Sequence, residues 1–369
     1  MSQGEYLEKI LTISIPTWNR SSLLNELIKQ LVRQISENRL ENKIEILISN
    51  NGSNDDTGIL VKSYQKHYIF ISYNNNGVNI GARANVLRSM QLATGKFLMV
   101  LGDDDRVNEN CLAGLVNFLE TNNETGLIID SSKFKKNPVG NKVVIDLSTL
   151  LVNFYWHIGN AGVFIVRTSF IKNNLQRHPY EYFSLSWPQT QLLILGLYQN
   201  KDLKCYIGNF DIVSEAIHGE VMIYTSYYLW RTLYYDLFMA IESIKHEIDD
   251  QYVTASKKYL SDNIKQTFYN ILQCGVFLDD EETRQKTARH ISENIHLFSS
   301  EEKFYLKIIN ATLRIPSSIA KLISNTFIFS IRGKKGINKK NEFVKSELLK
   351  KSKIKNSDNL VVREFHFES

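Results

Sequence analysis

The sequence predicts an α/β protein in which a doubly wound, mostly parallel sheet is followed by a C-terminal α-helical region. In the first 105 residues, four short β-rich runs alternate with amphipathic helical patterns, as in a parallel sheet with right-handed crossovers. Each of these runs ends in a polar stretch. From Val221 onward, apolar residues recur at helical spacing with few strand patterns. The composition, with 43% hydrophobic and 22% charged residues, is that of a globular protein.

The N-terminal elements follow one another as strand, helix and strand. Strands are expected at Leu11–Ile15, Ile44–Ser49, Tyr68–Tyr73 and within Lys96–Leu101. Between them, apolar residues at helical spacing predict helices over residues 23–35, 58–66 and 81–90. Because the carboxyl ends of parallel strands lie along one edge of a sheet, the polar residues after each strand are expected to line one crevice.

Three adjacent acids follow the fourth predicted strand. Asp103, Asp104 and Asp105 come directly after an apolar run and Gly102. Neighbouring carboxylates repel one another and cannot be buried unpaired, so they need water, bases or a cation. All-oxygen ligands suit Mg²⁺ or Mn²⁺, which keep positions open for substrate phosphates. A solvated acidic turn is the alternative interpretation.

The chain beyond Asp105 predicts further elements of the same domain. A helix is expected over Asn108–Glu120 and a strand over Gly126–Asp130. A turn at residues 137–141 would lead to a partner strand over Lys142–Ile145.

An aromatic segment then precedes a glycine-rich stretch and another strand pattern within Phe154–Arg167. Sugar rings commonly rest on aromatic faces beside polar groups. Trp156, His157 and Asn160, with Trp187 further along the chain, are therefore candidates for a pocket that holds an acceptor or a donor sugar. A packed core strand preceded by a loop is the alternative for each of them.

Charge and cysteine content narrow the class of protein. The net charge of +5 is modest for 369 residues, and its excess lies in Arg332–Lys355, where ten Lys or Arg stand against two Glu. We expect no nucleic-acid partner. The three widely spaced cysteines fit neither a disulfide framework nor a metal-binding pair, which favours a reducing cytoplasm. No signal-peptide pattern and no run of about 18 apolar residues is present, so neither export nor a membrane span is expected.

Four motifs each follow a predicted strand: Pro16–Arg20, Asn50–Asp55, Asn79-x-Gly81-x-x-x-Asn85 and Gly102–Asp105. Each motif alone is weak. In this order they resemble family 2 glycosyltransferases of the GT-A fold, over about Leu11 to Asp105. The resemblance implies transfer of a sugar from a nucleotide diphosphate donor, with a divalent metal, Mn²⁺ or Mg²⁺, at the departing diphosphate.

The resemblance also implies roles for single residues. Asp105 is the expected metal ligand, Asp103 would reach the nucleotide ribose or a metal-bound water, and Asp104 is the intervening residue. The nucleoside pocket wall is assigned to Pro16, Thr17, Asn19 and Arg20, and further nucleotide-sugar contacts to Asn50, Asn51, Asp55, Gly81, Arg83 and Asn85. An ordinary helix cap is the alternative for Asn50–Asp55, and a solvated helix face the alternative for Arg83.

Two departures from the family pattern leave roles open. The family usually has Asp where this chain has Asn50, so the nucleobase stays undetermined. The catalytic base often lies in a Glu-Asp pair that opens a helix, but residues 184–190 contain no base here, and Glu181 just upstream is the substitute. An exposed loop residue is the alternative. His218 lies where some relatives bring a histidine to the metal, and a structural histidine is the alternative.

Three domains are expected: a nucleotide-sugar transferase domain over residues 1–220, a helical domain over 221–331 and a basic, flexible tail over 332–369. A helix over Pro316–Ile331 would gather Ile319, Leu322, Ile323 and Phe327 on one side. An apolar face beside a basic cluster suits the surface of an anionic membrane. Packing of this helix on its own bundle, with a disordered tail, is the alternative.

The sequence therefore predicts an inverting, metal-dependent glycosyltransferase of bacterial surface polysaccharide synthesis. A UDP-sugar is favoured as donor, and the acceptor would be a hydroxyl of a glycan or a lipid-linked glycan. The expected location is the cytoplasm, with peripheral contact at the inner face of the cell membrane. A catalytically silent carbohydrate-binding or complex-forming subunit is the rival, against which the three acids argue. A nucleotidyltransferase is less favoured, because Pro16–Arg20 is not a glycine-rich phosphate loop.

Overall fold

The structure, a computed structural model, describes residues 9–132, 141–177, 186–214, 221–222 and 225–326, and a few positions between 338 and 363. The chain divides into two compact units. The first comprises residues 1–217 with 240–256, and the second comprises residues 218–239 with 257–369.

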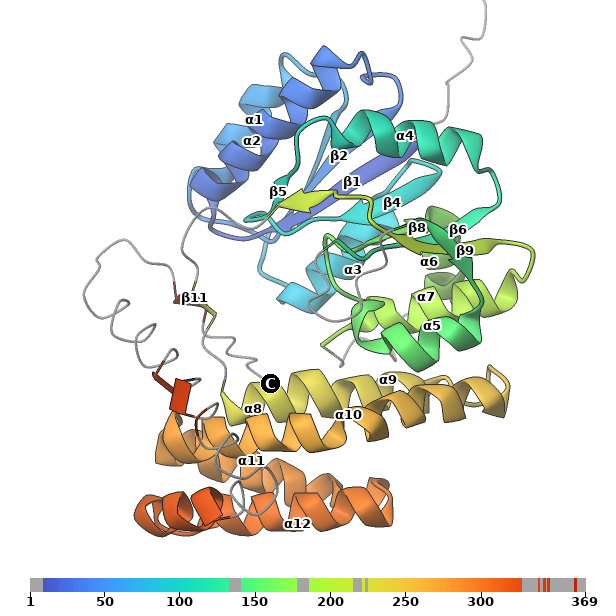
Figure 1. Cartoon of the computed structure of the whole chain (residues 1–369). Coiled ribbons are helices and arrows are strands. Elements are labelled where there is room, and N and C mark those ends of the chain that lie inside the picture. Colours follow the sequence, from blue (N-terminus) through green and yellow to red (C-terminus); the bar gives the residue numbers. More distant parts are fainter. Residues whose placement is uncertain are drawn as a thin grey trace, which may run out of the picture. The chain divides into compact units, whose positions relative to one another are not determined.

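An eight-stranded mixed sheet forms the centre of the first unit, counting the described residues (Figure 1). Its strands are β1 (Leu11–Thr17), β2 (Ile44–Asn50), β3 (Ile71–Asn75), β4 (Phe97–Val100), β6 (Thr125–Asp130), β7 (Val143–Ile145), β8 (Phe164–Arg167) and β9 (Lys204–Gly208). Their order is β3-β2-β1-β4-β8-β6-β9-β7. The predicted doubly wound, mostly parallel sheet is confirmed.

The first four strands pair in parallel, so their carboxyl ends meet at one edge. In register, Ile13 lies beside Ile46 and Met99. The third strand begins later than the sequence predicts: the amide of Tyr68 donates to the carbonyl of Tyr64, and Ile71 is the first residue that pairs with β2. Tyr68 therefore continues the helical turn before the strand.

The other half of the sheet contains antiparallel pairs. Strand β8 lies antiparallel between β4 and β6. The expectation that Lys142–Ile145 pairs across the turn with the strand before it is wrong, because β7 pairs with β9. The backbones of β9 and of the residues before β7 approach closely at Gly208. A Cβ at this position would lie 2.6 Å from the Cα of Lys142, so only glycine fits there.

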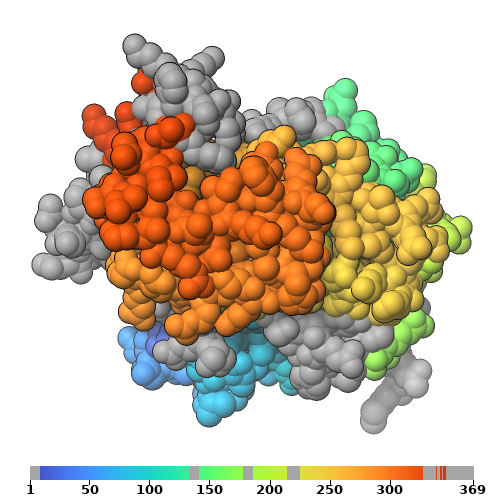
Figure 2. Space-filling view, turned by 90° about the horizontal axis from the view of Figure 1, so that it is seen from below, coloured from blue at the N-terminus to red at the C-terminus, as the bar shows by residue number. Residues whose placement is uncertain are grey.

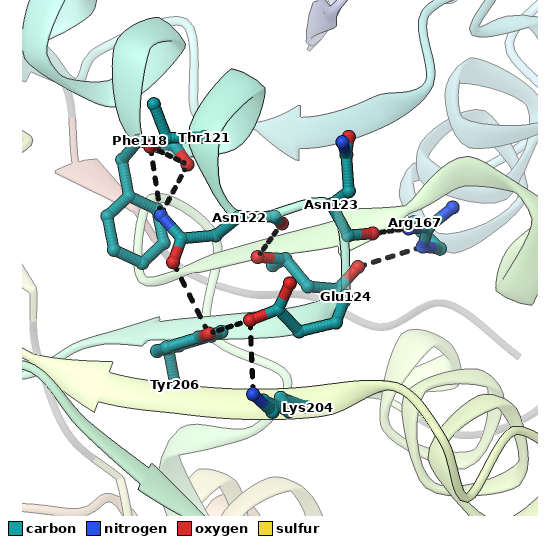
Figure 3. A network of polar contacts seen from close by, with 9 residues as sticks. Phe118, Thr121, Asn122, Asn123, Glu124, Arg167, Lys204 and Tyr206 are labelled. Carbon is teal, nitrogen blue, oxygen red and sulfur yellow. Dashed lines mark hydrogen bonds and ion pairs between the residues drawn. The ribbon is translucent and has the colours of Figure 1, made fainter.

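A polar network fastens the amino ends of β6 and β9 (Figure 3). The carboxylate of Glu124 accepts hydrogen bonds from Lys204 Nζ at 3.1 Å and from the hydroxyl of Tyr206 at 3.0 Å. Arg167, at the end of β8, donates from Nε to the carbonyl of Thr125 at 2.8 Å. This network lies at the edge of the sheet opposite the carboxyl ends of the parallel strands. It therefore stabilises the sheet and takes no part in the predicted site.

Helices cover both faces of the sheet. They are α1 (Ser21–Glu37), α2 (Thr57–Gln65), α3 (Ala82–Leu92), α4 (Cys111–Thr121), α5 (Leu147–Phe154), α6 (Thr168–Arg177) and α7 (Pro188–Gln199). On one face, Leu24, Leu27 and Ile28 of α1 pack with Ile13 and Ile15 in a fully buried core. Alternate residues of the strands point to this core because the side-chain period of a strand is two.

The second unit is mostly helical over its described residues, which also include one short parallel strand pair, β11 (Val221–Met222) with β12 (Val362–Arg363). Its elements are α8 (Ser226–Trp230), a π-helical turn (Arg231–Tyr235), α9 (Asp236–Ser243), α10 (Asp250–Phe277), α11 (Glu281–Asn294) and α12 (Ser300–Arg314), of which α9 and α10 extend into the first unit. Trp230 and Tyr234 are buried and pack against Phe298. Trp230 of α8 and Tyr234 of the π-helical turn thus belong to the helical core. Within the described residues, no helix has the length and apolar character to cross a membrane.

Candidate functional site

The loops after β1, β2 and β3 are joined by asparagine side chains. The side-chain carbonyl of Asn19 accepts from the amide of Asn54 at 2.9 Å, and the amide of Asn19 donates to the hydroxyl of Ser53 at 2.9 Å. Asn51 donates to Asn79 at 2.8 Å. These bonds link three strand ends into one surface, as the predicted crevice requires.

Asp103 contacts the end of β1 and the residue before α1, and it is almost fully buried. One carboxylate oxygen accepts from the hydroxyl of Thr17 at 2.8 Å and the other from Arg20 Nη1 at 2.9 Å. Burial raises the pKa of Asp103, while the Arg20 guanidinium and the Thr17 hydroxyl act in the opposite direction. The structure thus joins the first and fourth motifs through two direct contacts.

Asp104 and Asp105 lie against Gly102. A Cβ at Gly102 would be 2.7 Å from Oδ1 of Asp104 and 3.2 Å from Oδ2 of Asp105, so a side chain there would displace both carboxylates. Asp105 Oδ2 also accepts from the amide of Gly102 at 2.6 Å. The next residues, β5 (Arg106–Val107), pair antiparallel with β10 (Val213–Ser214), which fixes where the acidic turn ends.

Carboxylate oxygens of this kind fit a hard divalent cation. Asp104 and Asp105 are half-buried and would supply oxygen ligands, with remaining positions for water or phosphate. Among the residues that the structure describes, no group of three or more His, Cys, Asp or Glu is arranged as a complete metal site. His218 and Glu181, the other predicted metal ligand and the predicted base, lie outside the described residues.

Asn50 is buried and both ends of its amide are engaged. Its nitrogen donates to the hydroxyl of Tyr73 at 2.8 Å, and its oxygen accepts from the amide of Ser53 at 2.9 Å. These two bonds tie the end of β2 to β3 and to the loop that follows β2. Tyr73 is an additional candidate that the sequence pattern did not identify.

Asn85 holds the framework of the crevice. Its oxygen accepts from Ser49 Oγ at 2.8 Å and from Asn76 at 2.9 Å, and its nitrogen donates to the carbonyl of Ser49 at 2.9 Å. Gly81 precedes the helix with a φ of 89°, a conformation that favours glycine. Arg83 lies in the first turn of the same helix, α3.

Asp55 organises the start of two helices. Its carboxylate accepts from the amide of Ser21 at 3.0 Å and from the hydroxyl of Thr57 at 2.6 Å. Burial alone would raise the pKa of Asp55, but the hydrogen bonds from Thr57 and Ser21 together lower it. This geometry matches the helix-cap alternative for the second motif.

Pro16 occupies the end of β1 beside Ser49. A proline has no amide hydrogen and is tolerated only where no ladder bond is needed. The pairing of β1 with β4 ends at Ser14, which leaves room for Pro16. Two residues further on, Trp18 is 49% exposed, and we add this large aromatic side chain to the candidates at the strand ends.

The aromatic segment ends α5 and forms a 3-10 turn (Tyr155–His157), and the glycine-rich residues after it form a loop before β8. The amide of Gly162 donates to the carbonyl of Val100 at 2.7 Å, so this loop is bonded to the end of β4. Gly162 has a φ of 74°, and a Cβ there would lie 3.4 Å from Oδ2 of Asp105. The loop therefore lies next to the acidic turn.

Trp187 meets the same loop from the start of α7. A Cβ at Gly159 would lie 3.5 Å from the Cβ of Trp187, and the side chain of Gln189 donates to the carbonyl of Gly159. Burial lowers the pKa of His157 to about 4, so its imidazole is neutral at pH 7. Trp156, His157, Asn160 and Trp187 are all partly exposed.

Residues 12–181 match the sequence model of a family described as glycosyl transferase family 2. A curated relative, abequosyltransferase RfbV of Salmonella typhimurium (strain LT2), is 34% identical over 113 residues, which are 30% of this chain and 33% of the relative. The match thus spans about a third of that relative's length.

Solved structures at low sequence identity share the fold. TarS residues 1–349 of S. aureus give a TM-score of 0.51 at 15% identity, covering 83% of this chain and 91% of that one. The same fragment in complex with UDP gives 0.50 at 12% identity, with the same coverage. The mannosyltransferase PcManGT from Pyrobaculum calidifontis, in complex with GDP-Man and Mn²⁺, gives 0.50 at 13% identity, covering 83% and 87%.

The family model covers the strands whose carboxyl ends carry the motifs, and the solved structures share the sheet that places those ends together. Residues 12–181 are therefore similar to family 2 glycosyltransferases, and the chain shares the GT-A fold of these solved structures.

Proposed function

We propose that the protein transfers a sugar from a nucleotide diphosphate donor, with a UDP-sugar favoured, to a hydroxyl of a glycan or lipid-linked glycan in surface polysaccharide synthesis. The observation that carries this proposal is the contact of Asp103 with Thr17 and Arg20 beside Asp104 and Asp105. The names of the relatives support it, because RfbV is an abequosyltransferase and the TarS fragment was solved with UDP.

In the proposed reaction, the acceptor oxygen attacks the anomeric carbon from the face opposite the diphosphate. The bond from that carbon to the diphosphate breaks, a base takes the acceptor proton, and the configuration inverts. A divalent cation at Asp105, with His218 as a further ligand, would stabilise the charge on the departing diphosphate. Arg20 adds a positive charge close to Asp103, where it also suits a phosphate.

A panel of UDP, CDP, GDP and dTDP, each with and without Mn²⁺, tests the donor class. Only a ligand of the folded state raises the melting temperature. We expect one diphosphate, with UDP favoured, to stabilise the protein, and to do so more in Mn²⁺. A panel with no response would support the catalytically silent subunit.

Asp105→Asn tests the metal. The substitution keeps the shape of the side chain and removes the charge that would hold a divalent cation. We expect calorimetry to show that nucleotide affinity no longer depends on Mn²⁺, and transfer to fall to a trace. Asp56→Asn, at an exposed position before α2, is the matched control and should behave as wild type. Equal nucleotide binding of the wild type in EDTA would refute the metal role.

Glu181→Gln tests the base. If Glu181 accepts the acceptor proton, the substitution should slow transfer by about 10²-fold or more and leave donor affinity unchanged. Steady-state kinetics with separate donor titrations make the distinction. Unchanged turnover would point to Glu215, Glu220 or a substrate-assisted route.

We propose that the acceptor or the donor sugar binds next to the acidic turn of Asp103–Asp105. The side chains that would contact it are Trp156, His157, Asn160 and Trp187. A neutral imidazole and an amide can each donate and accept hydrogen bonds with sugar hydroxyls. We also propose that the acceptor is met at the inner face of the cell membrane.

A further inference from the structure

The chain directly after the acidic turn forms a strand of two residues, β5, with a different partner on each edge. On one edge it pairs with β10, and the amide of Asn108 donates to the carbonyl of Ile212 at 2.9 Å. Successive residues of a strand direct their backbone groups to opposite sides. The N–H and C=O groups of Val107 therefore face away from β10.

The side chain of Gln30, in the third turn of α1, bonds to both of these backbone groups. Its Nε2 donates to the carbonyl of Val107 at 2.7 Å, and its Oε1 accepts from the amide of Val107 at 3.0 Å. Val107 is 1% exposed, so water cannot replace these bonds, and unpaired buried groups are costly. The Gln30 amide thus takes the place of a neighbouring strand. One turn further on, Gln34 donates to the carbonyl of Asn108 at 3.0 Å.

Helix α1 consequently holds the acidic turn at both ends. Arg20, the residue before the helix, donates to Asp103, and Gln30 holds Val107. The helix itself is fixed on the sheet, because Leu24 and its other inward apolar residues are fully buried. The other two acids of the turn lie between the two attachment points. A movement of β5 away from α1 would therefore displace their carboxylates.

We propose that Gln30 is a positioning residue, which sets the carboxylates of Asp104 and Asp105 for the diphosphate end of the donor. The inference rests on the proposed function and deepens it. Groups that hold a metal-binding carboxylate in place typically contribute about 10–100-fold to affinity. A residue that only stabilised the fold would affect the nucleoside end and the diphosphate end of the site alike.

Gln30→Leu in the full chain tests the proposal, because leucine is similar in size and makes neither hydrogen bond. Calorimetry compares UDP with UMP, both in Mn²⁺. We expect the affinity for UDP to fall by about tenfold or more. The affinity for UMP should stay nearly unchanged, because UMP lacks the second phosphate that the acidic turn would meet.

Two further variants complete the comparison. Gln30→Glu keeps an acceptor for the Val107 amide and loses the donor, so its affinity for UDP should lie between those of wild type and Gln30→Leu. It also replaces Gln30→Leu in every measurement if that variant does not fold. Arg33→Gln is the matched control, since it removes an exposed ion pair from the same helix to Glu109. Exposed pairs contribute little, so this variant should bind UDP as wild type does.

Hydrogen exchange without ligand tests the position of the turn separately. Exchange over residues 101–108 should become about fivefold faster or more in Gln30→Leu, because the Val107 amide loses its acceptor. Peptides from β2 report on the stability of the first unit. Peptides from α12, whose residues are drawn in deep orange at the surface in Figure 2, report on the second unit. Both sets should exchange as in wild type.

Three outcomes would overturn the inference: unchanged exchange over residues 101–108, equal UDP affinity of wild type and Gln30→Leu, or equal losses for UDP and UMP. In each of these cases the wild type still binds UDP, so the proposed function stands. If the wild type binds neither nucleotide, the proposed function fails and this inference fails with it.

Discussion

At the residue scale, His290 shows how burial and neighbouring charges fix a protonation state. Its Nδ1 accepts a hydrogen bond from the indole nitrogen of Trp230 at 2.9 Å. The ring of Tyr235 packs edge-on against it, with centroids 4.8 Å apart. Burial first, and then the charges of Arg231 and Lys286, lower the pKa of His290 to about 4. The imidazole is therefore neutral in the folded protein near pH 7.

Stability should fall as pH falls from about 6.5 to about 4, because the unfolded chain binds a proton at His290 in that range and the folded chain does not. His290→Gln keeps an acceptor for Trp230 and removes the titration. Relative to this variant, we expect the wild type to lose about 1 kcal/mol of unfolding free energy between pH 7.5 and pH 5, after allowance for solvent screening.

Urea unfolding of both proteins at the two pH values measures this difference. His157 has the same direction of pKa shift but is present in both proteins, so its contribution cancels. A parallel pH dependence of wild type and variant would show that His290 does not contribute.

At the element scale, the loops after β2 and β3 approach each other so closely that only glycine fits. Gly52 has a φ of 69°, and a Cβ there would lie 2.5 Å from the carbonyl carbon of Val78. Val78 belongs to the segment that continues to Asn79, which bonds to Asn51. The fit of these two backbones fixes how closely the loops after β2 and β3 approach each other.

Gly52→Ala and Gly77→Ala form a matched pair. Both positions have positive φ, but a Cβ at Gly77 meets nothing within 4 Å. Gly77→Ala should cost about 1–2 kcal/mol from backbone strain alone. Gly52→Ala should cost at least about 2 kcal/mol more, because backbone atoms must move.

We also expect Gly52→Ala to weaken nucleotide binding by about tenfold or more, and Gly77→Ala to leave it nearly unchanged. Urea unfolding and calorimetry with the diphosphate that the panel selects measure the two effects. Equal costs for both variants would show that the Gly52 approach does not constrain the crevice.

At the scale of the whole molecule, residues 240–256 group with the first unit although they follow residues of the second. The side chain of Gln191 donates to Ser243 at 3.1 Å, and the hydroxyl of Tyr198 donates to Asp249 at 2.9 Å. Tyr198 and Tyr252 also pack edge to face. The first unit is thus completed by a segment beyond residue 220.

A fragment of residues 1–220 should therefore be less stable than the first unit within the full chain. Without residues 240–256, the fragment leaves Gln191 and Tyr198 of α7 without these partners and exposes apolar surface. We expect the fragment to melt at a lower temperature and to aggregate at concentrations where the full chain stays monodisperse. Calorimetry and light scattering would contradict this if the fragment melts at the temperature of the full chain.

The sequence by itself determined the order of strands and helices from Leu11 to Asp105 and placed Asp103–Asp105 directly after a buried strand. It could do so because the periodicity of apolar residues records local burial, and the residue after a strand needs no distant partner to be located. The motifs that resemble the family also lie at these strand ends, so the resemblance followed from the same local pattern.

Only the tertiary structure decided which residues meet. The antiparallel insertion of β8 and the pairing of β7 with β9 depend on contacts far apart in the chain, which no local period records. The same is true of the site: Asn85 holds Ser49 and Asn76, whereas Asp103 meets Thr17 and Arg20. In sequence these side chains are all polar residues near strand ends, and only their packing separates a framework contact from a side chain in the crevice.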